Sequence, residues 1–124
     1  MNTYDPPEAG NLHMLDVLGF YNIPLFYTCR NGEGGQAFLT LFADEAENGD
    51  ETWLYAPLSE TRMAAIMAGD ITFKDAFTRA EGGAVYVERV RADDGARLSL
   101  ETMAAATLPD DWLPEPQCRV GGGE

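Results

Sequence analysis

Five carboxylates lie close together between residues 44 and 51, and no basic residue interrupts them. They are Asp44, Glu45, Glu47, Asp50 and Glu51. A segment this acidic can bind a divalent cation, steer a basic partner, or simply keep a loop solvated. Trp53 and Tyr55 follow directly, and aromatic side chains beside charge are a common composition of interface hot spots. We predict that these seven residues bind a partner, with a solvated hairpin loop as the plain alternative.

Calcium is the first chemistry to test against this segment, because its start resembles an EF-hand loop. Asp44, Asn48 and Gly49 suit the first, fifth and sixth positions of such a loop. The third position is Ala46, which has no side-chain oxygen, and the twelfth is Tyr55, where a bidentate Glu is required. The sequence therefore predicts no metal site and no cofactor.

Nucleophilic catalysis and zinc binding need residue pairs that this chain does not supply. It has one histidine, His13, and two cysteines, Cys29 and Cys118, far apart in the sequence. Nothing in the sequence pairs His13 with a nucleophile, and these three residues cannot give the paired spacing of a structural zinc site. The Gly-rich residues 32–35 lack the Lys-Ser/Thr of a phosphate-binding loop. No catalytic residue is predicted.

The charge balance narrows the class of partner. The formal net charge is −13 over 124 residues, and residues 1–60 hold ten acids against one base, Arg30. Such a surface repels nucleic acid and anionic membrane and attracts basic proteins. No stretch is long and apolar enough to span a bilayer, and the N-terminus lacks the pattern of a signal peptide. We therefore expect a cytoplasmic protein with reduced cysteines and a basic protein partner.

The spacing of apolar residues predicts the strands and helices that position the acidic segment. Alternating or continuous apolar patterns predict six strands, at 12–23, 25–30, 36–43, 51–56, 84–91 and 97–101. Helical spacing begins after Ser59 and again after Thr72, which are natural N-caps. The predicted class is α+β, with a mainly antiparallel sheet of about six strands. Its order is a four-stranded meander, two short helices and a two-stranded hairpin.

The domain organisation is simple. Residues 1–11 read as a flexible N-terminal arm, 12–117 as a single α+β domain and 118–124 as a flexible tail. Prolines exclude a long helix between Leu108 and Pro116. We expect this stretch to lie as a strap, with Trp112 and Leu113 packed on the sheet.

Several segments between Leu15 and Leu113 resemble an uncharacterised family of small bacterial domains of unknown function. They are Asp16-Val17-Leu18, Pro24-Leu25-Phe26, Thr52-Trp53-Leu54-Tyr55-Ala56-Pro57-Leu58-Ser59, Asp75-Ala76-Phe77 and Leu108-Pro109-Asp110-Asp111-Trp112-Leu113-Pro114-Glu115-Pro116. The resemblance implies no activity and assigns no catalytic or binding residue.

Three functions stay open at this point. The first is a non-enzymatic acidic interaction protein of the inhibitor, immunity or anti-defence type. It would dock on a basic protein surface, such as the nucleic-acid groove of a nuclease or defence complex. The second is a small enzyme that uses carboxylates, with a divalent metal as an option. The third is an adaptor that binds a peptide at a sheet edge, which an exposed apolar edge would favour.

Overall fold

A computed structural model describes residues 6–8, 12–21, 23–32, 35–114 and 118–120. Six strands form one antiparallel sheet: β1 (Leu12–Tyr21), β2 (Ile23–Asn31), β3 (Ala37–Glu45), β4 (Glu51–Leu58), β5 (Ala84–Val90) and β6 (Arg97–Ala104). Two helices, α1 (Glu60–Met67) and α2 (Phe73–Thr78), lie between β4 and β5 in the chain. Short 3-10 turns occupy Glu81–Gly83, Ala105–Thr107 and Asp110–Trp112. The predicted α+β class with a six-stranded antiparallel sheet is confirmed.

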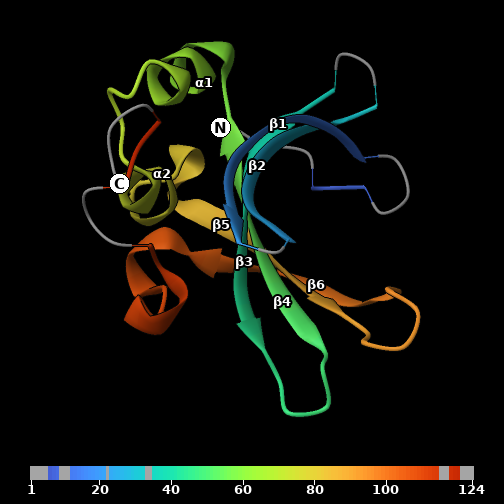
Figure 1. The fold of residues 1–124 in the computed structure, drawn as a ribbon. Coiled ribbons are helices and arrows are strands. Elements are labelled where there is room, and N and C mark those ends of the chain that lie inside the picture. The colour runs from blue at the N-terminus through green and yellow to red at the C-terminus, as the bar shows by residue number, and fades with distance from the viewer. Residues whose placement is uncertain (1–5, 9–11, 22, 33–34, 115–117, 121–124) are drawn as a thin grey trace.

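Each strand pairs with the next one along the chain, so the sheet order is β1-β2-β3-β4-β5-β6. The pairing of β4 with β5, from Glu51 opposite Val90 to Tyr55 opposite Tyr86, joins all six strands in one sheet. The sheet is strongly curved, and α1 and α2 lie on one side of it (Figure 1). The β3–β4 turn projects from the end of the sheet opposite α1 (Figure 1).

The main core lies between the sheet and the helices. Leu39, Leu41 and Leu54 point to this side, and Ile66 and Phe77 meet them from α1 and α2. Burying side chains of this size stabilises the fold by about 1.5–3 kcal/mol each. Trp112 and Leu113 pack against the same core, as predicted for the C-terminal strap.

Both helix starts form as the sequence predicts. The Ser59 hydroxyl accepts a hydrogen bond from the Arg62 amide at 3.1 Å, and the Thr72 hydroxyl accepts one from the Asp75 amide at 3.2 Å. Each cap satisfies one of the amide groups that a helix leaves unpaired at its start. Gly69, at φ 81°, follows the end of α1 and takes the left-handed conformation that glycine adopts without strain.

A second, smaller cluster covers the other face of the sheet. Cys29, Phe38 and Tyr55 are buried in it. The ring of Phe38 meets the rings of Tyr55 and Tyr86 edge-on, at centroid distances of 5.8 and 6.2 Å. Because both faces are covered, β3 and β4 carry large side chains in alternate positions on both sides.

Three residues of the predicted N-terminal arm lie against the sheet. The Asn31 side chain binds Pro6 and Glu8, and Arg97 binds Pro7, which is fully buried. Residues 1–5 and 9–11 of the predicted arm, and residues 121–124 of the predicted tail, lie outside the described residues. At the C-terminal side, the Cys118 carbonyl accepts a hydrogen bond from the Phe73 amide at 2.9 Å.

Candidate functional site

Two turns meet at the end of the sheet that carries the predicted acidic surface. The Asp50 Oδ1 atom in the β3–β4 turn accepts a hydrogen bond from the Ala92 amide in the β5–β6 turn, at 2.9 Å. Gly49 lies so close to the same residue that a Cβ atom on it would stand 3.1 Å from the Ala92 Cβ. The two turns are therefore fixed side by side.

Asp50 also holds its own turn in shape. Its Oδ2 atom accepts a hydrogen bond from Asn48 Nδ2 at 3.2 Å, and its amide donates to Asn48 Oδ1 at 3.1 Å. The Ala46 amide donates to the Asp50 carbonyl at 2.8 Å. Asp50, which the sequence places among the partner-binding acids, thus positions the turn that presents the others.

The remaining carboxylates of these turns face solvent. Asp44, Glu45 and Glu47 are exposed on the β3–β4 hairpin, and Asp93 and Asp94 are exposed on the β5–β6 turn. We call the group "the acidic end": Asp44, Glu45, Glu47, Asp50, Glu51, Asp93 and Asp94. The sequence pattern predicts the first five but not Asp93 and Asp94, because only the fold brings the second turn alongside the first.

The charge of the acidic end is only partly neutralised. Arg91 lies 3.5 Å from Asp94, and both side chains are at least half exposed, so this ion pair contributes little. Arg89 donates to the Thr52 hydroxyl at 3.3 Å. Within the β3–β4 register Glu45 lies directly opposite Glu51. Two like charges in this position are unfavourable for the sheet.

A hollow of about 490 Å³ lies between the two turns. Its lining combines four polar side chains with two apolar ones: Asn48, Asp50, Arg91, Ala92, Asp93 and Leu98. Leu98, on the edge strand β6, is 47% exposed. The acidic end therefore offers a shallow depression with an apolar contact point beside its charges.

Trp53 lies at the surface of the acidic end, whereas Tyr55 is buried. Trp53 is half-buried, its indole N–H donates to Glu51 Oε1 at 3.0 Å, and its ring lies 5.1 Å from the Phe42 ring. Tyr55 is only 3% exposed, and its hydroxyl donates to Glu88 Oε1 at 2.8 Å. A partner that docks on the folded surface does not reach Tyr55. We therefore remove Tyr55 from the predicted surface.

The sequence analysis also missed a buried polar cluster on the second face of the sheet. Glu88 accepts hydrogen bonds from Tyr55 and, at 2.7 Å through Oε2, from Arg97 Nε. The thiol of Cys29 lies 3.3 Å from the Thr40 hydroxyl. The one sequence signal was a charged residue, Glu88, inside an apolar strand pattern, and its partners come from β4 and β6.

One thiol and two phenol groups on this face of the sheet have raised pKa values. Burial raises the pKa of the Cys29 thiol to about 11 and the pKa of the Tyr27 hydroxyl to about 12. Burial also raises the pKa of Tyr55 far above its ordinary value. A thiol acts as a nucleophile only as thiolate, and an efficient general base has a pKa near the working pH. At neutral pH the Cys29 thiol and the Tyr27 and Tyr55 phenols are therefore protonated.

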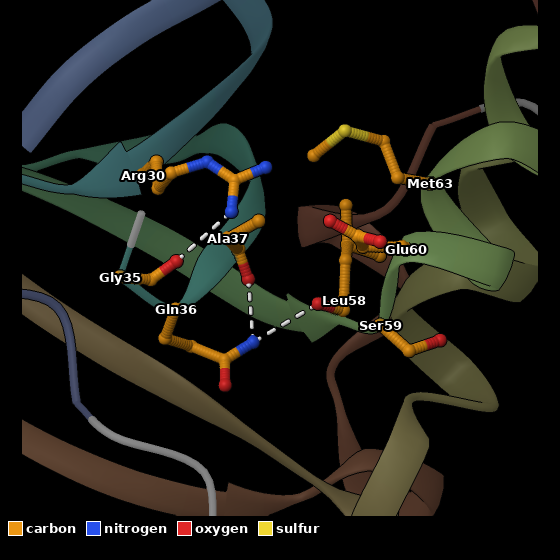
Figure 2. Close-up of a pocket in the computed structure, with 8 residues that line it drawn as sticks. All are labelled: Arg30, Gly35, Gln36, Ala37, Leu58, Ser59, Glu60 and Met63. Carbon is orange, nitrogen blue, oxygen red and sulfur yellow. Dashed lines mark hydrogen bonds between the residues drawn. The ribbon is translucent and has the colours of Figure 1, made fainter. Parts of the chain in front are cut away.

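A second groove, of about 300 Å³, lies at the start of α1. Figure 2 shows Arg30 on one wall and Glu60 and Met63 on the other. The polar groups at its base already bind backbone: Gln36 Nε2 donates to the carbonyls of Ala37 and Leu58, at 2.9 and 3.0 Å, and Arg30 donates to Gly35 (Figure 2). This arrangement ties the β2–β3 turn to the end of β4 and presents no catalytic pair.

The described residues hold neither a metal-binding cluster nor a membrane-spanning helix. Among the residues that the structure describes, no three His, Cys, Asp or Glu side chains gather closely enough to hold a metal ion. The described helices are all too short or too polar to cross a membrane.

The comparison with known families settles the relationship of the chain. A model described as a family of unknown function, DUF6575, matches residues 5–120. The chain belongs to DUF6575. This confirms the resemblance to an uncharacterised domain family and assigns no activity to any residue. No curated protein and no solved structure matches the chain significantly.

Proposed function

We propose that this DUF6575 domain is a non-enzymatic interaction protein that docks its acidic end on a basic protein surface. The partner surface is of the kind that binds nucleic acid, so the protein acts as an inhibitor, immunity or anti-defence factor. The observation that carries this proposal is the hydrogen bond between Asp50 and Ala92, which fixes the acids of two turns side by side. A fixed array of carboxylates has the charge pattern that such a basic surface attracts.

The cross-strand register supports the proposal. Glu45 and Glu51 face one another across β3 and β4, and like charges directly opposite destabilise a sheet by some tenths of a kcal/mol, up to about 1 kcal/mol. A sheet built for stability alone would carry opposite charges there. A concentration of negative potential on a partner-facing end accounts for two acids in this position.

Leu98 and Trp53 add short-range contacts to this long-range attraction. Leu98 is exposed beside the hollow, and Trp53 is half-buried beside Glu51. Interfaces gain most of their binding energy from a few such anchors, while surrounding charges set the rate and selectivity of association. We therefore assign steering to the exposed carboxylates and anchoring to these two side chains.

Affinity capture tests the proposal. The wild-type protein, a Glu45→Lys/Glu47→Lys variant and a Glu60→Lys/Asp70→Lys variant are immobilised, and host lysate is applied at low salt. The two variants change the charge equally, but Glu60 and Asp70 are exposed residues at and beyond the two ends of α1. We expect one basic, nucleic-acid-handling protein to bind the wild type and the α1 variant and to elute with salt.

The Glu45→Lys/Glu47→Lys variant should capture at least tenfold less of that protein than the wild type does, because it reverses two of the charges that face the partner. Equal capture by all three proteins would contradict the proposal. Loss of capture by the α1 variant instead of the Glu45→Lys/Glu47→Lys variant would place the docking surface at the other end of the sheet.

A second candidate, the sheet-edge adaptor, is favoured by exposed apolar side chains on both edge strands. Leu98 on β6 is 47% exposed, and Met14 and Leu15 on β1 are 52% and 44% exposed. A peptide that adds to an edge strand is held by backbone hydrogen bonds and apolar contacts. Such a complex should survive a wash at about 1 M salt, where charge attraction is screened within about 3 Å. Retention after that wash would favour edge binding over acidic docking.

A further inference from the structure

Residues Pro6–Glu8 lie against the sheet in the manner of a bound peptide. Asn31 Nδ2 donates to the Pro6 carbonyl at 2.9 Å, and Arg97 donates to the Pro7 carbonyl at 2.7 Å. The Glu8 amide donates to Asn31 Oδ1 at 2.9 Å. We infer that Asn31 and Arg97 form a binding seat for an extended, proline-containing peptide, which the chain's own N-terminal segment occupies.

The chemistry of the segment explains why it needs such a seat. Pro7 fixes its own φ and keeps Pro6 in an extended conformation. An extended segment of this kind has no internal hydrogen bonds, so its carbonyl groups need donors from elsewhere. Asn31 and Arg97 supply one donor each to two consecutive carbonyls. Proteins that recognise proline-rich peptides likewise exploit this preformed extended conformation.

The seat is built by the tertiary fold. Asn31 ends β2 and Arg97 begins β6, and three strands separate β2 from β6 in the sheet. The curvature of the sheet brings both side chains to one segment, which lies on the side away from α1 and α2 (Figure 1).

The Arg97 donor is held by a residue outside the N-terminal segment. Glu88, 7% exposed, accepts a hydrogen bond from Arg97 Nε at 2.7 Å and another from the Tyr55 hydroxyl. The Nη2 group of Arg97 then donates to the Pro7 carbonyl. Asn31 is 6% exposed with residues 6–8 in place, and its side chain bonds to Pro6 and Glu8 of that segment. A donor that is fixed in advance, as Arg97 is, loses little entropy when a ligand binds.

The contacts define the class of ligand. Pro7 is fully buried, whereas Pro6 and Glu8 are exposed. The seat therefore selects a proline at its centre, a preceding residue in extended conformation, and a following residue that has a backbone N–H for Asn31. A second proline in that last position would lose one of the three hydrogen bonds.

The tethered segment acts as a competitor for this seat. A segment joined to its own site has an effective concentration in the millimolar range, so a free peptide must exceed it to bind. A partner peptide would occupy the seat only where it outcompetes residues 6–8. This inference concerns the second face of the sheet and does not depend on docking through the acidic end.

Fluorescence anisotropy with a labelled peptide of residues 1–11 tests the inference on the full-length chain. The Pro7→Asp substitution places a carboxylate in a fully buried position and should release the tethered segment. We expect this variant to bind the peptide at least tenfold more tightly than the wild type does. A control peptide that itself carries Pro7→Asp should bind neither protein.

Asn31→Ala in the released variant should weaken peptide binding about tenfold, because it removes two hydrogen bonds, whereas Asn48→Ala should have no effect. The milder Pro7→Gly variant replaces Pro7→Asp if circular dichroism shows the latter to be unfolded. Absence of peptide binding by a folded, released variant overturns the inference, and so does equal binding of the control peptide. Unfolding of both variants also overturns it, because the segment would then be part of the core.

Discussion

The carboxylate of Asp50 lies 2.9 Å from the amide nitrogen of Ala92, and this contact joins two turns that β4 and β5 separate in the chain. Through it, Asp93 and Asp94 stand beside Glu45 and Glu47 at one end of the sheet. An acidic loop that moved freely would only keep the protein solvated. Two turns that are locked together can instead present one fixed pattern of charge to a partner.

Asp50→Ala should loosen this end of the sheet without unfolding the protein. The loss of the carboxylate leaves the Ala92 amide without its acceptor, and we expect the free energy of unfolding to fall by about 1 kcal/mol. Hydrogen exchange at the Ala92 amide should become faster at least tenfold. Glu47→Ala removes the same charge from an exposed position and should change neither quantity. Similar exchange rates in the two variants would show that Asp50 does not join the turns.

Gly49→Ala should destabilise the protein more than Gly95→Ala. Both glycines have a positive φ, 91° and 71°, which other residues adopt only with strain of about 1 kcal/mol or more. A Cβ on Gly49 would also press on the Ala92 Cβ at 3.1 Å, whereas nothing lies within 4 Å of a Cβ on Gly95. Chemical denaturation measures the difference. A larger loss for Gly95→Ala would mean that the turns are not in close contact.

Loss of Arg97 should be more damaging than loss of the Tyr55 hydroxyl. Arg97→Leu leaves the buried Glu88 carboxylate without its charged partner, for which we expect a loss of about 3 kcal/mol. Tyr55→Phe removes one hydrogen bond to the same carboxylate and should lower the free energy of unfolding by about 1–2 kcal/mol. Equal losses, measured by urea denaturation, would show that the ion pair adds nothing beyond a neutral hydrogen bond.

The stability of the fold should fall as pH rises above 9. The Cys29 thiol titrates at its ordinary pKa of 9.0 in the unfolded chain and at about 11 in the folded protein, because burial disfavours the thiolate. Below pH 9 both states are protonated. Between pH 9 and 11 the unfolded chain loses the proton first, so the free energy of unfolding falls by at most about 1.4 kcal/mol per pH unit from this group.

Denaturation at pH 8, 9 and 10 in a Cys118→Ser background checks this expectation. Adding Cys29→Ser should reduce the fall in the free energy of unfolding between pH 9 and 10, because serine does not titrate there. A decline of the same steepness with and without Cys29 would contradict the assignment.

Local chemistry made much of the fold predictable. Ser59 and Thr72 begin their helices because a hydroxyl placed before an apolar helical pattern caps free amides, and this depends only on neighbouring residues. Strand alternation accounts for the separation of Leu54 from Trp53 and Tyr55, which lie in clusters on opposite faces of the sheet. In both cases the deciding interactions are between residues close in sequence.

The candidate site was less predictable, because its geometry depends on contacts across the sheet. Alternation places Trp53 and Tyr55 on one face, but only the curvature of the sheet and the pairing of β4 with β5 bury Tyr55 against Glu88. Likewise, the short distance between Asp50 and Ala92 follows from strand register, which the sequence pattern of either turn does not contain. The role of Arg97 in holding Pro7 is non-local in the same way.

The most direct test of acidic docking is the association rate with the captured partner, measured by surface plasmon resonance as a function of ionic strength. If the acidic end steers the encounter, the wild-type rate should fall at least tenfold between low and physiological salt. The Glu45→Lys/Glu47→Lys variant should associate slowly at all salt concentrations. The α1 variant Glu60→Lys/Asp70→Lys should have the same association rate and salt dependence as the wild type. A wild-type rate that does not depend on salt, or a Glu45→Lys/Glu47→Lys variant that associates as fast as the wild type, would contradict the account.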